Sequence, residues 1–501
     1  MRKAKLFLQA KPLFSILLPA FFVLHGCVEN FGFIATNDAL SLVVYYVLVS
    51  VVLTGLFLLF YRDVVKAALA SSSILAFNFF FGSVHDFLKK IAGNTIIIKY
   101  SFILPFSLIL FLALIIYLKK TKRNFEMVTQ YANLLFAVLI LIDIVNLATK
   151  SAPASGLSVS QESLQLCDSC TKPDIYLIIA DEYAGKKELS DIFSFDNTQF
   201  ETDLTNRGFH IVSNTRSNYN WTIYSVASLF GMDYLKNLKT QAINNADMFG
   251  CSDIINDNKL LHFFERLGYN IYNCSIFDFD GLPKPVSPVF LPTRKSLVTG
   301  QTFVRRVKRD LSFNFATPKM IERELKHNLF NNVKLDSLTR KIACENQFRP
   351  KFVYTHLVMP HYAYYFDSLG RENPAEKLYD GYKLNKEGYL SYLFYTNRKL
   401  LQLIDQIRSC SSRPPVIILM SDHGYRQFIE PIDHQYYFFN LNAVCLPGGN
   451  YAEFYDGMTN VNQFRVILNT LFKQKLPLLN DSTSFLEEPN SNSTRQSGIH
   501  D

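Results

Sequence analysis

Cysteine is scarce in this sequence, and its scarcity excludes one class of protein. Eight cysteines in 501 residues are too few for a fold held together mainly by disulfides. Cys167 and Cys170 form a CxxC pair, but no second pair follows at zinc-finger spacing. Cys344 and Cys410 each end a helical stretch shortly before an expected strand, which would place both at one sheet edge. The sequence leaves open whether Cys344 and Cys410 form a disulfide or remain two buried thiols.

Polar faces are absent from the apolar stretches in the first 150 residues. Five such stretches occur, at residues 12–28, 39–61, 64–84, 101–118 and 128–148. Each is close to the ~20 residues that a helix needs to cross a hydrocarbon layer of ~30 Å. A soluble helix bundle would need polar faces toward water, and these stretches offer none. The sequence therefore predicts a five-helix transmembrane domain over residues 1–150.

Basic residues set the expected orientation, because Lys and Arg near the ends of spans stay on the cytoplasmic side. Three basic clusters fall on one side of the membrane if the N-terminus is cytoplasmic: Arg2, Lys3, Lys5 and Lys11; Arg62 and Lys66; and Lys119, Lys120, Lys122 and Arg123. Lys89, Lys90 and Lys99 disagree with this orientation, because it places them in an outer loop. Five crossings place everything after Lys150 outside the cytoplasm. The clusters largely explain the net charge of +8, which is no sign of nucleic-acid binding.

The rest of the chain has the pattern of an α/β domain. Residues 151–172 are Ser-rich and aperiodic, as expected of a linker. Strands are expected at 174–180, 209–213, 269–275, 351–358 and 415–421, and helices near 197–207, 257–267 and 385–409. This alternation predicts an α/β/α sandwich with a mostly parallel sheet over residues 173–480. Residues 481–501 are polar and predicted to form a disordered tail.

Carboxylates and imidazoles follow or end three of the predicted strands. They are Asp181 and Glu182, His356 and His361, and Asp422 and His423. Ligand sites in open α/β sheets lie beyond the carboxyl ends of the strands, so these side chains should converge. Mixed oxygen and imidazole donors favour a divalent ion such as zinc or manganese. The alternative is a set of turn-forming aspartates with solvated histidines.

Thr222 is the candidate nucleophile. In RSNYNWTIYSVASLFGM (residues 216–232) it opens a helix of small residues, and a helix N-terminus favours a bound anion such as phosphate. The alternative is that Thr222 only caps the helix. Next to a metal, its hydroxyl would be activated as a nucleophile.

These residues resemble those of the alkaline phosphatase and sulfatase superfamily. PDIYLIIADE (173–182) is similar to the opening strand and metal carboxylate of sulfatases, and SDHG (421–424) to the later Asp-His ligand pair. Five spans followed by such a domain resemble the layout of lipoteichoic acid synthases and phosphoethanolamine transferases. The resemblance implies one or two metal ions, the first held by Asp181, Thr222, Asp422 and His423.

The resemblance also suggests residues for a second metal or for the substrate. THLVMPHYAYY (355–365) resembles the transferases' stretch with two histidines five apart, which are His356 and His361 here. His434 and Glu182 join this group, although His356 could be a core histidine and His434 a surface one. The transferases usually carry a Glu at the first carboxylate and another Glu soon after the DHG motif, whereas this chain has ADEY (180–183) and DHGYRQ (422–427). In the place of the second Glu, Arg426 could donate to a phosphate or sulfate oxygen. Sulfatases need Cys or Ser followed by Pro and Arg at the nucleophile, so sulfate ester hydrolysis is disfavoured.

The resulting expectation is a multi-pass enzyme of a bacterial-type cytoplasmic (inner) membrane with a periplasmic catalytic domain. It would transfer a phospholipid-derived phospho-head group to an envelope glycan or lipid through phospho-Thr222, with His361 protonating the leaving oxygen or positioning the acceptor. Three alternatives are a phosphodiesterase or phosphatase with the same site, an inactive envelope-binding protein, and a transporter that uses Asp143 in the fifth span.

Overall fold

The structure, a computed structural model, forms two compact units. Met1–Ser155 and Leu291–Ala316 make up the helical unit, and Gly156–Phe290 and Thr317–Asp501 make up the α/β unit. The structure describes residues 11–31, 33–93, 95–149, 157–160, 162–238, 241–286, 294–315, 318–378 and 384–488. Arg2, Lys3 and Lys5, which were predicted to lie on the cytoplasmic side, are therefore outside the described residues. So are residues 489–501 of the predicted polar tail.

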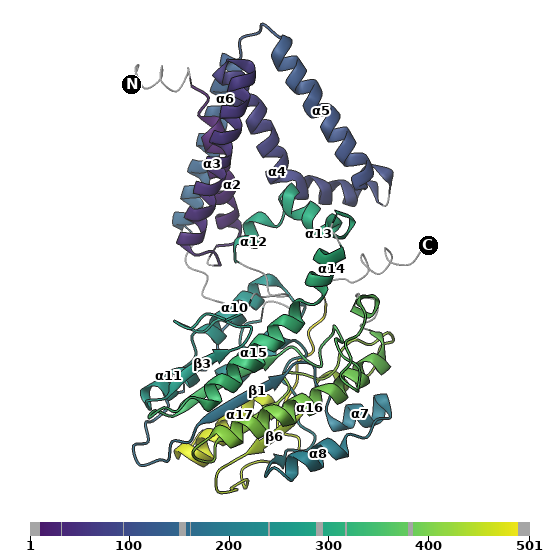
Figure 1. The fold of residues 1–501 in the computed structure, drawn as a ribbon. Coiled ribbons are helices and arrows are strands. Elements are labelled where there is room, and N and C mark those ends of the chain that lie inside the picture. Colours follow the sequence, from purple (N-terminus) through teal and green to yellow (C-terminus); the bar gives the residue numbers. More distant parts are fainter. Residues whose placement is uncertain are drawn as a thin grey trace. The chain divides into compact units, whose positions relative to one another are not determined.

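Apolar helices make up most of the helical unit (Figure 1). They are α2 (Phe14–Glu29), α3 (Thr36–Tyr61), α4 (Val64–Ala92), the short η1 (Ile96–Ile98), α5 (Tyr100–Lys120) and α6 (Glu126–Thr149). Four of them, α3 to α6, are long and apolar enough to cross a membrane. The first predicted span corresponds to α2, which at 16 residues is shorter than these four. The side chain of Asp63 begins α4 by accepting the backbone N–H groups of Val65 and Lys66.

Asp143, the ionisable residue in the last apolar helix, is paired. It is 3% exposed, and its Oδ1 lies 3.3 Å from Nδ1 of His25 in α2. An acidic group in an apolar layer is costly unless another polar group meets it. Because α6 packs against α2, His25 of α2 is the polar group that meets Asp143.

A later segment of the chain belongs to the helical unit. It contains α12 (Arg294–Thr299) and α13 (Phe303–Phe315). The backbone N–H of Gly82 in α4 donates to the carbonyl oxygen of Gln301 at 2.8 Å. A Cβ at position 82 would lie 2.5 Å from that oxygen, so this approach requires glycine. The sequence pattern had assigned these residues to the 173–480 domain.

The α/β unit is built on a six-stranded mixed sheet in the order β2-β6-β5-β1-β4-β3. The strands are β1 (Ile175–Ala180), β2 (His210–Ile211), β3 (Asn270–Cys274), β4 (Lys351–Leu357), β5 (Val416–Met420) and β6 (Asn442–Cys445). β1 pairs in parallel with β4 and β5, and β3 with β4, whereas β5–β6 and β6–β2 are antiparallel. All residues of β1, β4 and β5 are buried, as their continuous apolar runs indicate. Five strands form where the sequence predicted them, and β6 was not predicted.

Helices surround this sheet (Figure 1). They are α7 (Lys186–Phe193), α8 (Thr198–Thr205), α9 (Thr222–Gly231), α10 (Asn245–Asn256), α11 (Lys259–Arg266), α14 (Pro318–Leu325), α15 (His327–Cys344), α16 (Lys386–Cys410) and α17 (Asn460–Phe472), with η2 (Ala375–Leu378) and η4 (His434–Tyr437). α15 packs on β3 and β4 and against α16, while α9 packs against α10, α11 and α17. The predicted helices near 197–207, 257–267 and 385–409 correspond to α8, α11 and α16.

Two disulfides lie in the α/β unit. One joins Cys344 at the end of α15 to Cys410 at the end of α16, with a Cα separation of 4.8 Å. This confirms the bridge that the sequence left open against buried thiols. The other joins Cys167 to Cys170.

Part of the predicted polar tail packs on the α/β unit. The side chain of Asn220 accepts the backbone N–H of Leu486 at 2.8 Å and donates to its carbonyl oxygen at 3.1 Å. Leu486 is 1% exposed. Residues 481–488 therefore cover the chain just before Thr222, and the rest of the tail lies outside the described residues.

Candidate metal centre

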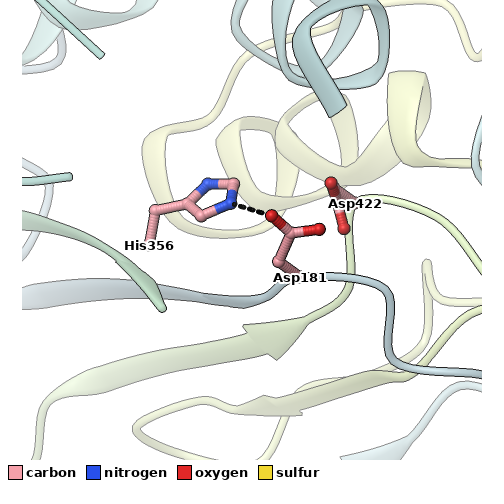
Figure 2. A group of neighbouring side chains, drawn as sticks. All are labelled: Asp181, His356 and Asp422. Atoms are coloured by element: carbon pink, nitrogen blue, oxygen red, sulfur yellow. Dashed lines mark hydrogen bonds and ion pairs between the residues drawn. The ribbon is translucent and has the colours of Figure 1, made fainter. Parts of the chain in front are cut away.

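Three strands bring Asp181, His356 and Asp422 to one edge of the sheet (Figure 2). Asp181 directly follows β1, and His356 lies in β4 opposite Ile179 of β1. Asp422 follows β5, whose Met420 is also opposite Ile179. One ligand atom from each side chain lies within 4.8 Å of the others, and all three residues are buried. The parallel pairing of β4 and β5 with β1 thus assembles the group.

Burial gives these side chains unusual ionisation. Burial raises the pKa of Asp181 to about 7, and the neighbouring Asp422 carboxylate adds to the rise. Burial works to raise the pKa of Asp422 as well, but the His423 ring and the hydrogen bond from the backbone N–H of Glu182 hold it below its usual range. Burial lowers the pKa of His356 to about 4, so this imidazole is neutral at pH 7. The group therefore offers a neutral imidazole and one firmly ionised carboxylate at neutral pH.

Two carboxylate oxygens in this group fit a cation. Among the described residues, Asp181 Oδ1 and Asp422 Oδ2 are buried without a hydrogen-bond partner. Buried polar atoms are normally satisfied, because an unmet carboxylate oxygen in a dry site is unfavourable. A divalent ion between them would supply the missing interaction. His356 is oriented for the same purpose, since its Nδ1 lies 2.8 Å from the hydroxyl of Tyr354 and its Nε2 faces Asp181 at 3.5 Å.

Thr222 and His423 meet next to this group. Thr222 is the first residue of α9, and its Oγ1 lies 3.2 Å from Nε2 of His423. That Nε2 is also 3.4 Å from Asp422 Oδ2. Nδ1 of His423 lies 2.7 Å from the carbonyl oxygen of Gly424. Because a carbonyl can only accept, Nδ1 of a neutral His423 carries the proton and Nε2 offers its lone pair toward Thr222.

The first turn of α9 is tied to the loop that follows β5. The hydroxyl of Ser225 donates to the carbonyl oxygen of Asp422 at 2.6 Å. Every residue of α9 is buried, which holds the helix N-terminus in place beside the carboxylates. Unpaired N–H groups at such a terminus favour a bound anion.

Glu182 has a strained backbone that links the loops of the site. Its φ of 61° lies in the left-handed region, which is unfavourable for a residue other than glycine. In this conformation its N–H donates to Asp422 Oδ1 at 3.0 Å. Its carboxylate accepts the backbone N–H of Arg426 at 3.0 Å and lies 3.6 Å from Nε2 of His361. Glu182 and His361 therefore form a second acid–imidazole pair beside Asp181.

Arg426 stacks on Trp221, the residue before Thr222. Its guanidinium carbon lies 3.8 Å from the centre of the indole ring. Its Nε is 3.9 Å from the Glu182 carboxylate. Among the described residues, Nε and Nη1 have no hydrogen-bond partner although they are buried. These donors suit an oxygen of a phosphate group.

His434 has a different environment. It begins η4, is exposed, and its ring stacks on Phe485 with centroids 3.7 Å apart. Phe485 belongs to the segment 481–488 that packs near residue 220. Of the described contacts of His434, none joins it to Asp181, His356 or Asp422.

No family model matches the chain, and no curated protein matches it. The chain is similar to solved phosphoethanolamine transferases and sulfatases. One is the C-terminal periplasmic domain of EcEptC from Escherichia coli in complex with zinc, with 11% identity over 62% of this chain and 86% of that chain and a TM-score of 0.38. Another is the integral membrane lipooligosaccharide phosphoethanolamine transferase A of Neisseria meningitidis, with 13% identity over 95% of both chains and a TM-score of 0.36.

A third is a putative sulfatase of Bacteroides fragilis, with 12% identity over 63% of this chain and 77% of that chain and a TM-score of 0.37. Similarity at this level establishes neither a family nor an activity.

Two side chains of the site were missed by reasoning from the sequence. Trp221 was not picked out, although the chain has a single tryptophan and it directly precedes Thr222. Glu188 in α7 is fully buried behind Gly424, and its Oε2 accepts the backbone N–H of Tyr425 at 3.2 Å. The sequence of this amphipathic helix does not indicate that its acidic residue is buried. Only the packing of α7 on the loop after β5 shows it.

Proposed function

We propose that the protein is a membrane-anchored, metal-dependent phosphotransferase with Thr222 as its nucleophile. The observation that carries the proposal is the contact between Thr222 Oγ1 and His423 Nε2, 3.2 Å, beside two buried carboxylates with unsatisfied oxygens. The Thr222 hydroxyl thus lies at a helix N-terminus, in contact with an imidazole nitrogen and beside a candidate cation site. This combination is the one that phosphoryl transfer uses.

The first metal is assigned to Asp181, Thr222, Asp422 and His423, and the structure adds His356 to these candidates. Glu182 and His361 are candidates for a second ion. When bound, a divalent ion such as zinc or manganese supplies Lewis-acid stabilisation of phosphate oxygens and lowers the pKa of a coordinated hydroxyl.

The side chains of the site have distinct tasks in the proposed transfer. His423 Nε2 accepts the proton of the Thr222 hydroxyl, and the Thr222 oxygen attacks phosphorus while the bond between phosphorus and the lipid oxygen breaks. The N–H groups at the start of α9 and the guanidinium of Arg426 stabilise negative charge on the non-bridging oxygens. His361 gives its proton to the leaving oxygen of the lipid. The acceptor hydroxyl then passes its proton to His361 and attacks phosphorus, and the Thr222 oxygen leaves with the proton that His423 had taken.

The four long apolar helices support the membrane part of the proposal. A phospholipid donor is found only in a bilayer, so an anchored enzyme has constant access to it. We place the protein in a bacterial-type cytoplasmic membrane with its N-terminus inside and the α/β unit in the periplasm, where an envelope glycan or lipid is the acceptor.

The test uses full-length protein in vesicles that contain phospholipid with a radiolabelled phosphate, supplied with zinc or manganese. Acid quenching followed by mass spectrometry should find the labelled phospho-head group on the peptide that contains Thr222. Thr222→Ala should lose the adduct and at least about 1,000-fold of the turnover. Thr205→Ala is the matched control, because among the described residues the Thr205 hydroxyl bonds only to the Glu201 carbonyl oxygen of its own helix.

The products separate the alternatives. Labelled head group on a second molecule supports transfer, whereas free head group alone would identify a hydrolase that uses the same residues. Near-normal turnover by Thr222→Ala would refute the covalent route. A protein without turnover that also loses no divalent ion when Asp422 is replaced would be an envelope-binding protein.

A further inference from the structure

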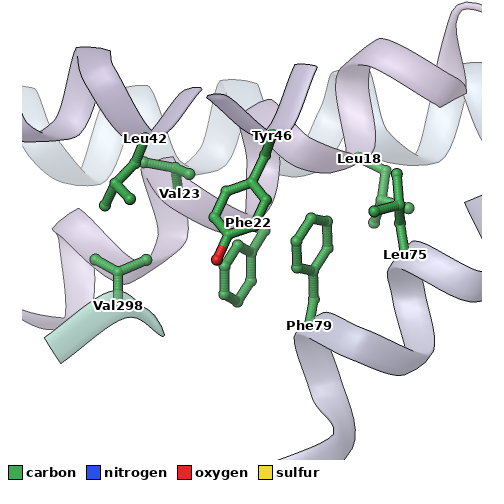
Figure 3. Close-up of a cluster of buried hydrophobic side chains, with 8 residues drawn as sticks. All are labelled: Leu18, Phe22, Val23, Leu42, Tyr46, Leu75, Phe79 and Val298. Atoms are coloured by element: carbon green, nitrogen blue, oxygen red, sulfur yellow. The ribbon is translucent and has the colours of Figure 1, made fainter. Parts of the chain in front are cut away.

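The helical unit contains a large apolar cavity. Its volume is about 840 Å³, within the range of roughly 300–1,000 Å³ that is usual for ligand sites. Side chains of α3, α4 and α5 form most of its wall, and residues 299–308 complete it. The segment 294–315 is held there by packing as well as by Gly82, because Val298 joins the buried cluster of Phe22, Phe79 and their neighbours (Figure 3). The cavity is therefore a built feature of this unit.

A second apolar cavity adjoins the first. Its volume is about 510 Å³, and α4 and α5 form most of its wall. Phe77, Ser107 and Phe111 line both cavities. Two apolar spaces that share one wall match a ligand with two hydrocarbon chains better than a ligand with one.

Two positive charges at the first cavity are not compensated. Four basic residues lie in the first half of α13, and two of them have carboxylate partners: Arg306 pairs with Asp86, and Arg309 with Asp310 at 2.7 Å. Arg305 and Lys308 line the cavity and are exposed. The described residues include no carboxylate in ion-pair distance of either one. Three positions apart, they lie on one side of the helix, at the cavity.

We infer that this site holds an anionic glycerophospholipid, with its acyl chains in the two cavities and its phosphate between Arg305 and Lys308. Apolar walls in a membrane unit accept hydrocarbon chains, and two unpaired cations favour a phosphate oxygen of a lipid with net negative charge. A zwitterionic lipid would bring its own ammonium group toward the same cations. The inference shares only the membrane anchor with the proposed function and not its chemistry, because every residue that carries it belongs to the helical unit.

The test measures lipid retention by the full-length protein. Protein in detergent is incubated with equal amounts of phosphatidylglycerol and phosphatidylethanolamine, and bound lipid is counted by native mass spectrometry. The wild type should retain phosphatidylglycerol at least about fivefold more than phosphatidylethanolamine. Arg305→Gln with Lys308→Gln should abolish this preference. Lys89→Gln with Lys90→Gln is the matched control, because these exposed lysines line neither cavity, and it should behave as the wild type.

A second variant tests the cavities separately from the charges. Ser107→Trp places a large ring where the two cavities meet and should reduce retention of both lipids, with a thermal melt to show that the protein is folded. Equal retention of the two lipids by the wild type would overturn the inference. So would unchanged phosphatidylglycerol binding in the Arg305/Lys308 variant or in folded Ser107→Trp protein.

Discussion

Arg426 and Trp221 form a stacked pair beside the proposed nucleophile, with 3.8 Å between the guanidinium carbon and the ring centre. The stack fixes the direction of a guanidinium whose Nε and Nη1 have no hydrogen-bond partner among the described residues. A planar, oriented fork of donors suits a phosphate group better than a mobile one, because less conformational entropy is lost on binding.

Trp221→Ala should therefore raise KM for the phospholipid about tenfold, as expected for a loss of about 1.4 kcal/mol of binding free energy. Arg426→Gln should have a larger effect. Lys187→Gln is the control, because Lys187 lies 5.1 Å from the Phe439 ring in a cation–aromatic pair of its own. Unchanged KM in both site variants would show that Arg426 does not contact the substrate.

Gly424 is expected to tolerate no side chain. A Cβ there would lie 2.6 Å from both the Glu188 carboxylate and the carbonyl oxygen of Phe439, and the backbone oxygen cannot swing away. Gly424→Ala should lower the free energy of unfolding by about 1–3 kcal/mol and displace His423, with a matching loss of turnover. Gly55→Ala, which meets nothing within 4 Å in α3, should be neutral. Wild-type melting and activity in Gly424→Ala would contradict the placement of this loop.

Removal of the metal should destabilise the protein. Asp181 and Asp422 share a buried site, and a bound ion that is lost on unfolding stabilises the folded state by about 2.7 kcal/mol when its concentration is 100 times Kd. A chelator should therefore lower the Tm of the wild type by several degrees, and Asp422→Asn should remove this response. Asp456→Asn, whose carboxylate accepts from Asn214 at the surface, should respond as the wild type. A chelator-insensitive wild type with no metal by elemental analysis would refute the assignment.

Glu188 should make stability depend on pH. Burial raises the pKa of this carboxyl well above its ordinary value, so the folded protein keeps a proton that the unfolded chain releases. The free energy of unfolding should then fall as pH rises above the ordinary Glu range, by up to about 1.4 kcal/mol for each pH unit, until the raised pKa of the folded state is passed. Glu188→Gln should remove this slope. Urea unfolding of the two proteins from pH 5 to pH 8 measures it, and parallel curves would show that the carboxyl is ionised in the folded state.

The Cys344–Cys410 disulfide should contribute more to stability than Cys167–Cys170. The first closes a loop with a sequence separation of 66 and the second one of 3. By the loop-entropy relation, removal of the first should cost about 4 kcal/mol and removal of the second roughly 1.5 kcal/mol. Denaturant unfolding of Cys344→Ala/Cys410→Ala and Cys167→Ser/Cys170→Ser compares them. Equal losses would mean that strain or residual structure in the unfolded chain outweighs loop length.

The sequence by itself determined five of the six strands and the polar residues that follow them. The apolar run at 174–180 has no alternation, so it indicated a strand buried on both faces, and the structure has β1 there. Asp181 and Asp422 could be picked out because they directly follow such runs, and long apolar stretches indicated the helices of the first 150 residues. These features are local, and a strand or an apolar helix is recognisable from its own residues.

Only the tertiary structure decided which of these residues meet. The pairing of β1 with β4 places His356 with the two aspartates, where the sequence had suggested a second metal or the substrate. The packing of α9 brings Thr222 to His423 from 201 positions away, and residues 294–315 pack with the apolar helices although the α/β chain flanks them on both sides. Strand order and helix packing depend on the surfaces of distant segments, and no single segment of sequence contains that information.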